Sequence, residues 1–347
     1  TDIMANDWAW DAFWQLATHA LATRPKSLGR AGFECTTDNP SLIFGDIMDA
    51  NRLAKEMKHF QPDWVVHLAA RTDTDIYDLE ADINEYIVNT LGTQNVLDAI
   101  NACSSIKRAI ITSTQFVCEA GYLPKHNVDY QPFTLYGKSK ILTEQFTREA
   151  NLSCKWAIIR PSTIWGPWAL RYRDTMFRVM RKGLYFHPAR KKVFRSYGYV
   201  KNVCFQIHRL LEIEAAAMHR DVFYVGDAPV NLLKWVKGIA QHLTGKNVRL
   251  LPTWMVKMIA LTGDALKAFD IGFPLTTTRF NSMTQDYITP IEKTILTLGD
   301  APYDMESGIK EMIDWYNDIS ADIQRPAFRM PEITQIPQSN QVATQHG

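Results

Sequence analysis

Short apolar runs alternate with longer amphipathic segments along the first half of the chain. The runs have the length and the β-branched content of buried strands, and they fall at residues 33–38, 41–46, 63–70, 107–117 and 155–165. Between them, apolar residues recur at three- and four-residue steps, which predicts helices over residues 50–60, 82–103 and 134–150. This alternation favours a parallel sheet with helices on both faces, an α/β fold of the Rossmann-type, doubly wound kind.

The pattern becomes mixed after Gly166. Strand-like and helical segments are interspersed there, at residues 193–200, 221–227, 246–251, 253–268 and 304–320. We therefore predict a Rossmann-like domain over residues 1–165 and a smaller mixed α/β lobe over residues 166–323, with some of its segments returning to the sheet. Residues 324–347, rich in Gln and Pro, are expected to form a flexible tail.

Polar residues follow several of the predicted strands. In a doubly wound sheet, ligands bind beyond the carboxyl ends of the strands. The candidates at those ends are Asp38, Asp46, residues 69–71, Ser113, Thr114 and residues 161–163.

The segment "TLYGKSKILTEQ" places Tyr136 and Lys140 four residues apart, on one side of a predicted helix. An ammonium near a partly desolvated phenol favours the phenolate and so lowers the phenol's pKa. Such a Tyr can exchange a proton with an alcohol or carbonyl near neutral pH, and Thr114, with Ser113 second, is placed to hold the substrate oxygen. A Tyr and a Lys four residues apart more often have a purely structural role. Here the pair lies one crossover after a strand that ends in Ser-Thr, and this position favours the catalytic interpretation.

Composition narrows the possible partners. The net charge is +1 and charged residues make up 22% of the chain, which gives no argument for nucleic acid or an anionic membrane as a bulk partner. The five cysteines are widely spaced, without a CxxC or His/Cys cluster, so we expect no disulfide framework, no metal site and a cytoplasmic location. No run is long and apolar enough to predict a membrane span, and the first residues lack the order of a signal peptide.

Six segments together resemble the extended short-chain dehydrogenase/reductases, the family of NAD-dependent epimerases and dehydratases that act on nucleotide sugars. They are "HLAA" (67–70), "NTLGTQNVLDA" (89–99), "ITST" (111–114), "YGKSK" (136–140), "RPSTIWGP" (160–167) and "RSYGYVKNV" (195–203). YxxxK by itself is a weak signal, whereas six segments in the family's order and spacing are a strong one. They cover roughly residues 33–320.

The resemblance implies a role for each matching position. Tyr136 would be the acid/base, Lys140 would lower its pKa and hold the nicotinamide ribose, and Thr114 would be the hydroxyl partner. Arg195 would pair with the substrate's diphosphate, with Ser113 and Gln115 beside it. The remaining NAD-binding positions would be Asp38, Asp46, Ile47, Leu68, Ala69, Ala70, Asn89, Pro161 and Thr163. For Ala69, Ala70 and Asn89, a purely structural role in helix packing explains the residue about equally well.

One part of the family pattern is missing. Members begin with a glycine-rich phosphate loop, and the usual spacing back from Asp38 places its glycines near Trp14, Ala17 and Ala20. That segment instead has the pattern of an amphipathic helix. Either the start of the domain is truncated or altered, or the dinucleotide is bound weakly or not at all; a non-catalytic binding protein of the same fold is therefore an open alternative.

The reaction and substrate are also constrained. Where related dehydratases carry an Asp-Glu pair, this chain has Gln115 and Phe116, which favours epimerisation or simple reduction over dehydration. The segment from Arg171 to Arg195 contains nine Lys/Arg residues and only one acidic residue, Asp174. This local excess of positive charge suits a nucleotide-diphosphate sugar as substrate. A 3β-hydroxysteroid dehydrogenase-like activity is the rival, since residues 199–203 and 223–229 resemble that branch somewhat. By resemblance alone, we expect a homodimer.

Overall fold

The computed structural model describes residues 45–74, 76–189, 192–267, 269 and 273–323, and a four-stranded parallel sheet lies at its centre. The strands follow the order β1–β2–β3–β8 across the sheet. Their bounds are Trp64–His67 for β1, Arg108–Thr112 for β2, Lys155–Pro161 for β3 and Asp221–Val225 for β8. Because all four strands run in one direction, their carboxyl ends meet at one edge, where ligands bind in such sheets.

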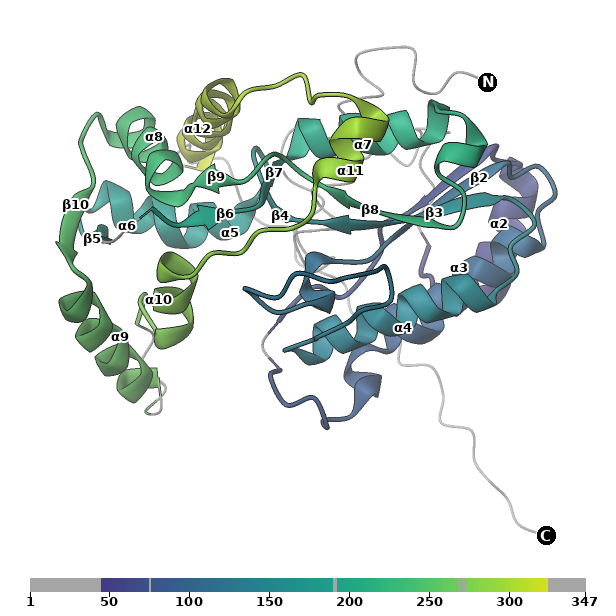
Figure 1. Cartoon of the computed structure of the whole chain (residues 1–347), viewed down its shortest axis with the longest axis horizontal. Coiled ribbons are helices and arrows are strands. Elements are labelled where there is room, and N and C mark those ends of the chain that lie inside the picture. The colour runs from purple at the N-terminus through teal and green to yellow at the C-terminus, as the bar shows by residue number, and fades with distance from the viewer. Residues whose placement is uncertain (1–44, 75, 190–191, 268, 270–272, 324–347) are drawn as a thin grey trace, which may run out of the picture.

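Helices cover both faces of the sheet (Figure 1). Successive residues of a strand point to opposite faces, so Ile111 packs among the side chains of α2 and α3, and Ile110 packs against α7. Both faces are therefore apolar, as expected of a parallel sheet. The covering helices are α2 (Ala50–Phe60), α3 (Ile87–Asn101) and α4 (Leu135–Glu149) on one side, and α7 (Val200–Glu212) and α11 (Glu292–Leu298) on the other.

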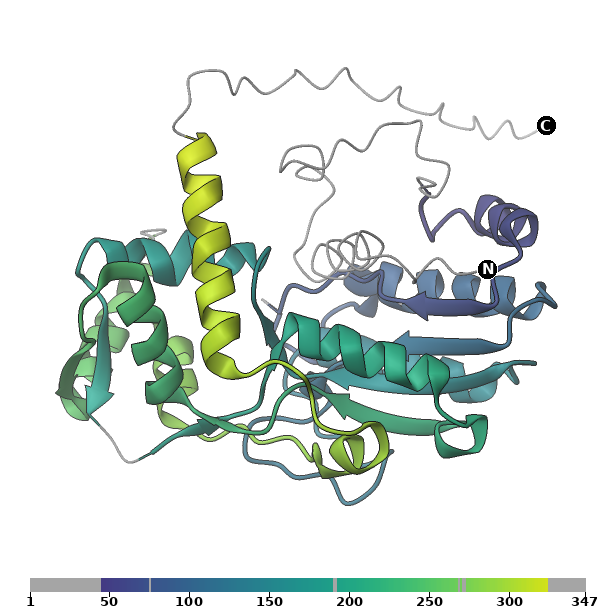
Figure 2. The same ribbon diagram turned by 90° about the horizontal axis from the view of Figure 1, so that it is seen from above.

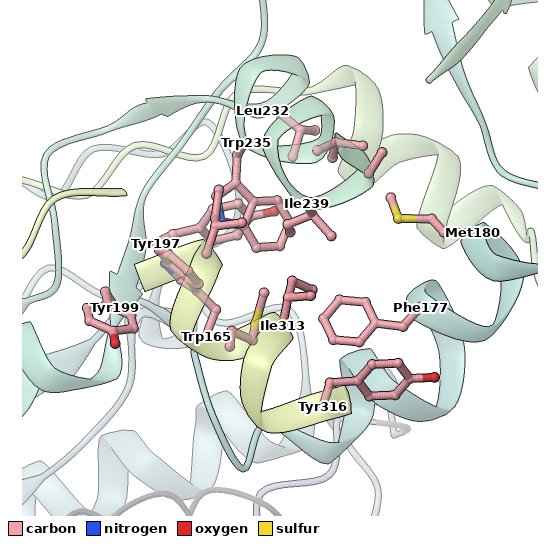
Figure 3. Packing of buried hydrophobic residues seen from close by; sticks show 14 of the residues in the cluster. Trp165, Phe177, Met180, Tyr197, Tyr199, Leu232, Trp235, Ile239, Ile313 and Tyr316 are labelled. Atoms are coloured by element: carbon pink, nitrogen blue, oxygen red, sulfur yellow. The ribbon is translucent and has the colours of Figure 1, made fainter. Parts of the chain in front are cut away.

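The smaller lobe has a core of its own, rich in aromatic side chains (Figure 3). Trp235 lies at its centre, with its ring centroid 4.8 Å from that of Tyr197 and 5.7 Å from that of Trp165. Figure 2 shows this lobe beside the sheet. Its longer helices are α8 (Leu232–Thr244), α9 (Thr253–Lys267), α10 (Thr277–Thr284) and α12 (Met305–Ile323). Its short strands are β4 (Thr163–Trp165), β5 (Phe186–Ala189), β6 (Phe194–Arg195), β7 (Tyr197–Tyr199), β9 (Val230–Asn231) and β10 (Arg249–Pro252).

The structure confirms the predicted α/β class and refines several bounds. The predicted strand 107–117 ends at Thr112 and continues as a 3₁₀ turn, Gln115–Val117, and the predicted strand 155–165 divides into β3 and β4 at Ser162. The predicted helix 82–103 begins as a 3₁₀ turn, Ile83–Tyr86, before α3. Strand β8 belongs to the second predicted domain and yet completes the sheet.

Some sequence predictions lie outside the described residues. They are the strand at 33–38, the altered phosphate loop near Trp14, Ala17 and Ala20, and the tail 324–347. Within the residues that are described, no helix is long and apolar enough to cross a bilayer. The same residues contain no group of three His, Cys, Asp or Glu side chains that could hold a metal ion.

Candidate active site

A cavity of about 410 Å³ lies at the carboxyl ends of β1, β2 and β3. Most of the positions singled out from the sequence meet there. Those that line it are Leu68, Ala70, Ser113, Thr114, Gln115, Tyr136, Lys140, Pro161 and Thr163. The fold therefore brings the predicted catalytic residues and half of the predicted NAD contacts to one place, although they come from four separate parts of the chain.

The start of α4 sets the position of Tyr136. The Thr134 side chain caps the helix by accepting a hydrogen bond from the Gly137 backbone N–H at 3.1 Å, which places Tyr136 in the first turn. Gly137 has no side chain to hold the helix away, and a Cβ there would lie 2.3 Å from the Phe116 carbonyl oxygen. The close approach of α4 to the turn after β2 thus depends on this glycine.

The Tyr136 phenol is buried among aromatic rings. Thr114, the predicted partner of its hydroxyl, lines the same cavity. Phe116 lies edge-on to the Tyr136 ring, with centroids 6.3 Å apart, and the Tyr86 ring lies 6.0 Å away. Burial raises the pKa of Tyr136 to about 12, and the interaction with Thr114 opposes this shift only partly. The prediction of a lowered Tyr136 pKa is therefore wrong for the protein alone, because desolvation outweighs any effect of Lys140.

Lys140 follows one helical turn later and is only 1% exposed. Burial lowers the pKa of its ammonium to about 8, against the opposing pull of the Glu144 carboxylate. His67, at the end of β1, is buried nearby, and burial together with the Lys140 charge lowers its pKa to about 3. A neutral His67 and a cation with a depressed pKa therefore share the interior next to the cavity.

Glu144 anchors a buried ionic network behind the cavity. It accepts from Arg160 Nε at 2.7 Å and from Arg160 Nη2 at 2.8 Å, a bidentate pair with side chains no more than 1% exposed. The Ser113 hydroxyl donates to the same carboxylate at 2.7 Å, and Arg148 and the Tyr130 hydroxyl contact it from the other side. Ser113 lines the cavity, but its hydroxyl is committed to Glu144, which leaves Thr114 as the better-placed partner for a substrate.

Three buried polar atoms at the cavity have no hydrogen-bond partner among the described residues. They are Thr112 Oγ1, Gln115 Oε1 and Ser162 Oγ. Unpaired polar atoms in the interior cost free energy, so they are usually satisfied by a ligand, an ion or water. The Gln115 amide nitrogen, in contrast, donates to Thr163 Oγ1 at 2.9 Å, which orients the free oxygen. This edge of the cavity therefore has the polar groups needed to hold a polar ligand.

Asn89 has a structural role in the described residues. It accepts from the Arg71 backbone N–H at 2.8 Å, donates to the Arg71 carbonyl at 2.9 Å and donates to Ser139 Oγ at 2.9 Å. It thus ties the loop after β1 to α3 and α4, and it is absent from the cavity lining, as is Ala69. These contacts favour the packing interpretation of Asn89.

Two further predicted NAD contacts lie away from the cavity. Asp46 accepts a hydrogen bond from the Met48 backbone N–H at 2.9 Å, and the Ile47 side chain packs against Gly92 of α3. Both precede α2, at the side of the sheet formed by β1. Asp38 lies outside the described residues, so its predicted contact with the adenosine ribose stays a prediction.

Arg195 and Arg171 are placed differently with respect to the cavity. Arg195 is buried in β6, with its guanidinium 5.2 Å from the Tyr287 ring centroid, and it does not line the cavity. Arg171 does line it, beside Pro167. The sequence analysis includes Arg171 only as one of nine cations. Its position shortly after the "RPSTIWGP" segment is the signal that could have distinguished it from the others.

Comparison with known proteins agrees with this architecture. A family model described as "NAD dependent epimerase/dehydratase family" matches residues 8–226, more than half of the chain. The chain is 31% identical over 213 residues to N-acetyl-alpha-D-glucosaminyl-diphospho-ditrans,octacis-undecaprenol 4-epimerase of Escherichia coli O157:H7, covering 58% of this chain and 60% of that protein. It is 29% identical over 156 residues to the spore coat polysaccharide biosynthesis protein SpsK of Bacillus subtilis (strain 168), covering 44% and 53%. The chain thus spans little more than half the length of these relatives.

Solved structures share the fold at low identity. UDP-glucuronic acid 4-epimerase from Bacillus cereus, in complex with UDP-glucuronic acid and NAD, has a TM-score of 0.57 at 18% identity, covering 79% of this chain and 81% of that one. UDP-glucose 4-epimerase from Thermotoga maritima, with UDP-glucose, has a TM-score of 0.56 at 18% identity, covering 80% and 84%. From the match of the family model, together with the ordered motifs that meet at the cavity, it follows that this chain belongs to the NAD-dependent epimerase/dehydratase family.

Proposed function

We propose that this protein is an NAD-dependent epimerase or reductase that acts on a sugar carried by a nucleotide diphosphate. One observation carries the proposal: the side chains of Tyr136 and Thr114 line one cavity that also presents Lys140 and Arg171. None of the described residues that line this cavity is an Asp or a Glu. Two cations without a carboxylate suit an anionic ligand better than a sterol.

The residues at the cavity fit the nicotinamide end of NAD. Leu68 and Ala70 provide a small apolar wall, and the unpaired Gln115 oxygen and Ser162 hydroxyl could accept or donate hydrogen bonds to the carboxamide and ribose. Lys140 would hold the ribose. When bound, NAD supplies a hydride acceptor next to the sugar carbon.

The protein's own residues then move the proton. Thr114 would hold the sugar hydroxyl in line with Tyr136, whose phenolate takes the proton as the carbon is oxidised. The raised Tyr136 pKa means that the phenolate must be stabilised in the complex, and the Lys140 ammonium is the cation of the same helix that also lines the cavity. Phe116 excludes water from one side of the phenol and offers no acid/base for a dehydration step.

The carrier of the sugar has a second candidate. The Escherichia coli relative is named for a sugar on undecaprenyl diphosphate, and its 31% identity makes a polyprenyl diphosphate an alternative to the nucleotide diphosphate. Both carriers share the diphosphate that Arg171 would contact.

The test combines turnover with cofactor binding. UDP-glucose, UDP-glucuronic acid and UDP-N-acetylglucosamine are incubated with the protein and NAD, and the sugar products are followed by NMR. We expect Tyr136→Phe to lower turnover by roughly a hundredfold or more, while Tyr77→Phe, at a phenol that is 53% exposed, leaves it unchanged. If Tyr136→Phe retains full turnover, Tyr136 is not the acid/base. If NAD at millimolar concentration does not raise the melting temperature, the non-catalytic alternative is favoured.

A further inference from the structure

Helix α9 presents apolar side chains to solvent. Its inner face packs against the lobe as expected: Val256 and Ala260 are fully buried in a small cluster with Phe280 of α10. Its outer face carries Trp254 and Met258, which are 68% and 57% exposed. Leu261, one turn further along the same face, is 46% exposed.

This outer face departs from the usual pattern of a surface helix. A helix with one face packed normally has polar residues on the opposite face, whereas the spacing of Trp254, Met258 and Leu261 gives a continuous apolar stripe there. Leu250, before the helix, is 45% exposed, and Phe269, after it, is 78% exposed. An apolar face exposed in this way marks an interaction site more often than singly exposed apolar residues do.

A basic cleft lies next to this stripe along the chain. It has a volume of about 630 Å³ and is formed by the ends of α6 (Arg178–Arg181) and α8 and the start of β10. Four cations line it, and no carboxylate does among the described residues; the cations are Arg181, Lys182, Lys246 and Arg249. Strand β10 leads from this cleft directly into α9, at the end of the molecule farthest from the parallel sheet (Figure 1).

We propose that α9 and the basic cleft dock this lobe on the surface of an anionic phospholipid bilayer. Apolar side chains with a Trp among them, bordered by Lys and Arg, are the arrangement by which an interfacial helix inserts shallowly while cations contact lipid phosphates. Lys257, between Trp254 and Met258 on the helix, can extend its ammonium toward the same phosphates.

Charge favours this occupant over a second copy of the chain. Two copies packed through α9 would bury the apolar stripe, but they would leave the four cations of the basic cleft without a counter-charge. Anionic lipid supplies that charge. Nucleic acid would neutralise the cations as well, but it would leave the apolar stripe exposed to water. This inference does not depend on the proposed function.

Vesicle flotation tests the proposal with the full chain. We expect the protein to float with vesicles of 70:30 POPC/POPG and to bind pure POPC vesicles far more weakly. Reversing charge in Lys246→Glu/Arg249→Glu should weaken binding to the anionic vesicles by roughly tenfold or more, since each cation near such a surface contributes about fivefold. Trp254→Ser/Met258→Ser should weaken binding by at least a similar factor, roughly tenfold.

Matched variants at the sheet end of the molecule provide the controls. Leu296→Ser removes an apolar side chain that is 86% exposed on α11, and Lys55→Glu/Lys58→Glu reverses two exposed charges on α2. Both should bind the anionic vesicles as the unaltered chain does, and all variants should melt within a few degrees of it. The proposal is overturned if the unaltered chain does not float, if the α9 variants float as well as the controls do, or if light scattering shows that Trp254→Ser/Met258→Ser converts a dimer into a monomer. Vesicle binding and sugar turnover are read separately, so failure of one leaves the other standing.

Discussion

The Glu144 carboxylate and the Arg160 guanidinium form a bidentate ion pair inside the protein, with N–O distances of 2.7 and 2.8 Å. Glu144 stands one helical turn after Lys140, and the same carboxylate receives the Ser113 hydroxyl from the end of β2. The pair therefore joins α4, which carries Tyr136 and Lys140, to the two strands β2 and β3 whose ends form the cavity.

Glu144→Gln should destabilise the fold strongly. The substitution leaves the Arg160 guanidinium buried without a counter-charge, and removal of one partner of a buried pair costs about 3–5 kcal/mol. Urea unfolding monitored by circular dichroism gives the change in unfolding free energy. Glu149→Gln, at the exposed end of the same helix, is the control and should change it by less than about 0.5 kcal/mol. Equal effects of the two substitutions would mean that the buried pair contributes nothing.

Lys140→Met should abolish turnover and stabilise the fold at neutral pH. Burial lowers the pKa of Lys140 from 10.5 to about 8, so the folded state binds this proton less tightly than the unfolded chain does. Stability from this group therefore falls as pH falls from about 10.5 to 8, a cost of roughly 3 kcal/mol that is almost fully present at pH 7.

The pH dependence identifies the cause of the Lys140 effect. Methionine has similar length and carries no charge, so the variant should unfold at a higher urea concentration than the unaltered chain at pH 7. This advantage should shrink between about pH 8 and 10.5 and vanish above that range, where the amine is deprotonated in both states of the unaltered chain. A destabilised variant at pH 7, or an advantage that does not depend on pH, would refute the interpretation.

Arg171→Ala and Arg195→Ala should have different effects on substrate binding and on thermal stability. Arg171 lines the cavity, so its loss should raise KM for a diphosphate-linked sugar by roughly tenfold or more, with a smaller effect on the melting temperature. Arg195 is 9% exposed and packs over Tyr287, so its loss should lower the melting temperature as well. If Arg195 also contacts the diphosphate, as the sequence resemblance implies, the KM of the Arg195→Ala variant should rise for diphosphate-linked substrates. An unchanged KM for Arg195→Ala would assign the diphosphate contact to other cations.

Sequence patterns predicted those features of the site that depend only on residues close together in the chain. Helix α4 was predicted to within one residue at each end, because its apolar spacing, its Thr134 cap and the Ala150 terminus all lie within the segment. The positions of β2 and β3, though not their exact ends, followed from the apolar runs, and the parallel sheet places Thr114 and Thr163 at the same cavity. These predictions needed no knowledge of distant contacts.

Properties that depend on distant partners could not be read from the same patterns. The direction of the Tyr136 pKa shift is set by burial among Phe116 and Tyr86, which come from other elements. Arg195 is occupied by Tyr287, a residue 92 positions later in the chain. Helices α7 and α8 were missed as separate elements, because strand-like runs such as 193–200 dominated that part of the pattern.

Asp227 should make stability depend on pH in the opposite direction to most carboxylates. It lies after β8, where it accepts from the Tyr199 backbone N–H and from Asn202 Nδ2 at 2.7 Å, and burial raises its pKa from 3.8 to about 6. The folded state thus binds this proton more tightly than the unfolded chain does. Stability from this group is fully present below pH 3.8 and is lost as pH rises through about 6, by roughly 3 kcal/mol.

Asp227→Asn isolates this contribution. Asn keeps one acceptor oxygen and cannot ionise, so the absolute stability of the variant also reflects the lost hydrogen bond to Tyr199 or Asn202. The difference in unfolding free energy between the unaltered chain and the variant, measured by urea unfolding at half-unit steps from pH 4 to 7.5, removes the titration of all other groups. We expect this difference to shift against the unaltered chain as pH rises, with the change centred between pH 4 and 6. A difference that stays constant over that range would mean that Asp227 has the same pKa in the folded and unfolded states, and that its hydrogen bonds from Tyr199 and Asn202 fully offset its burial.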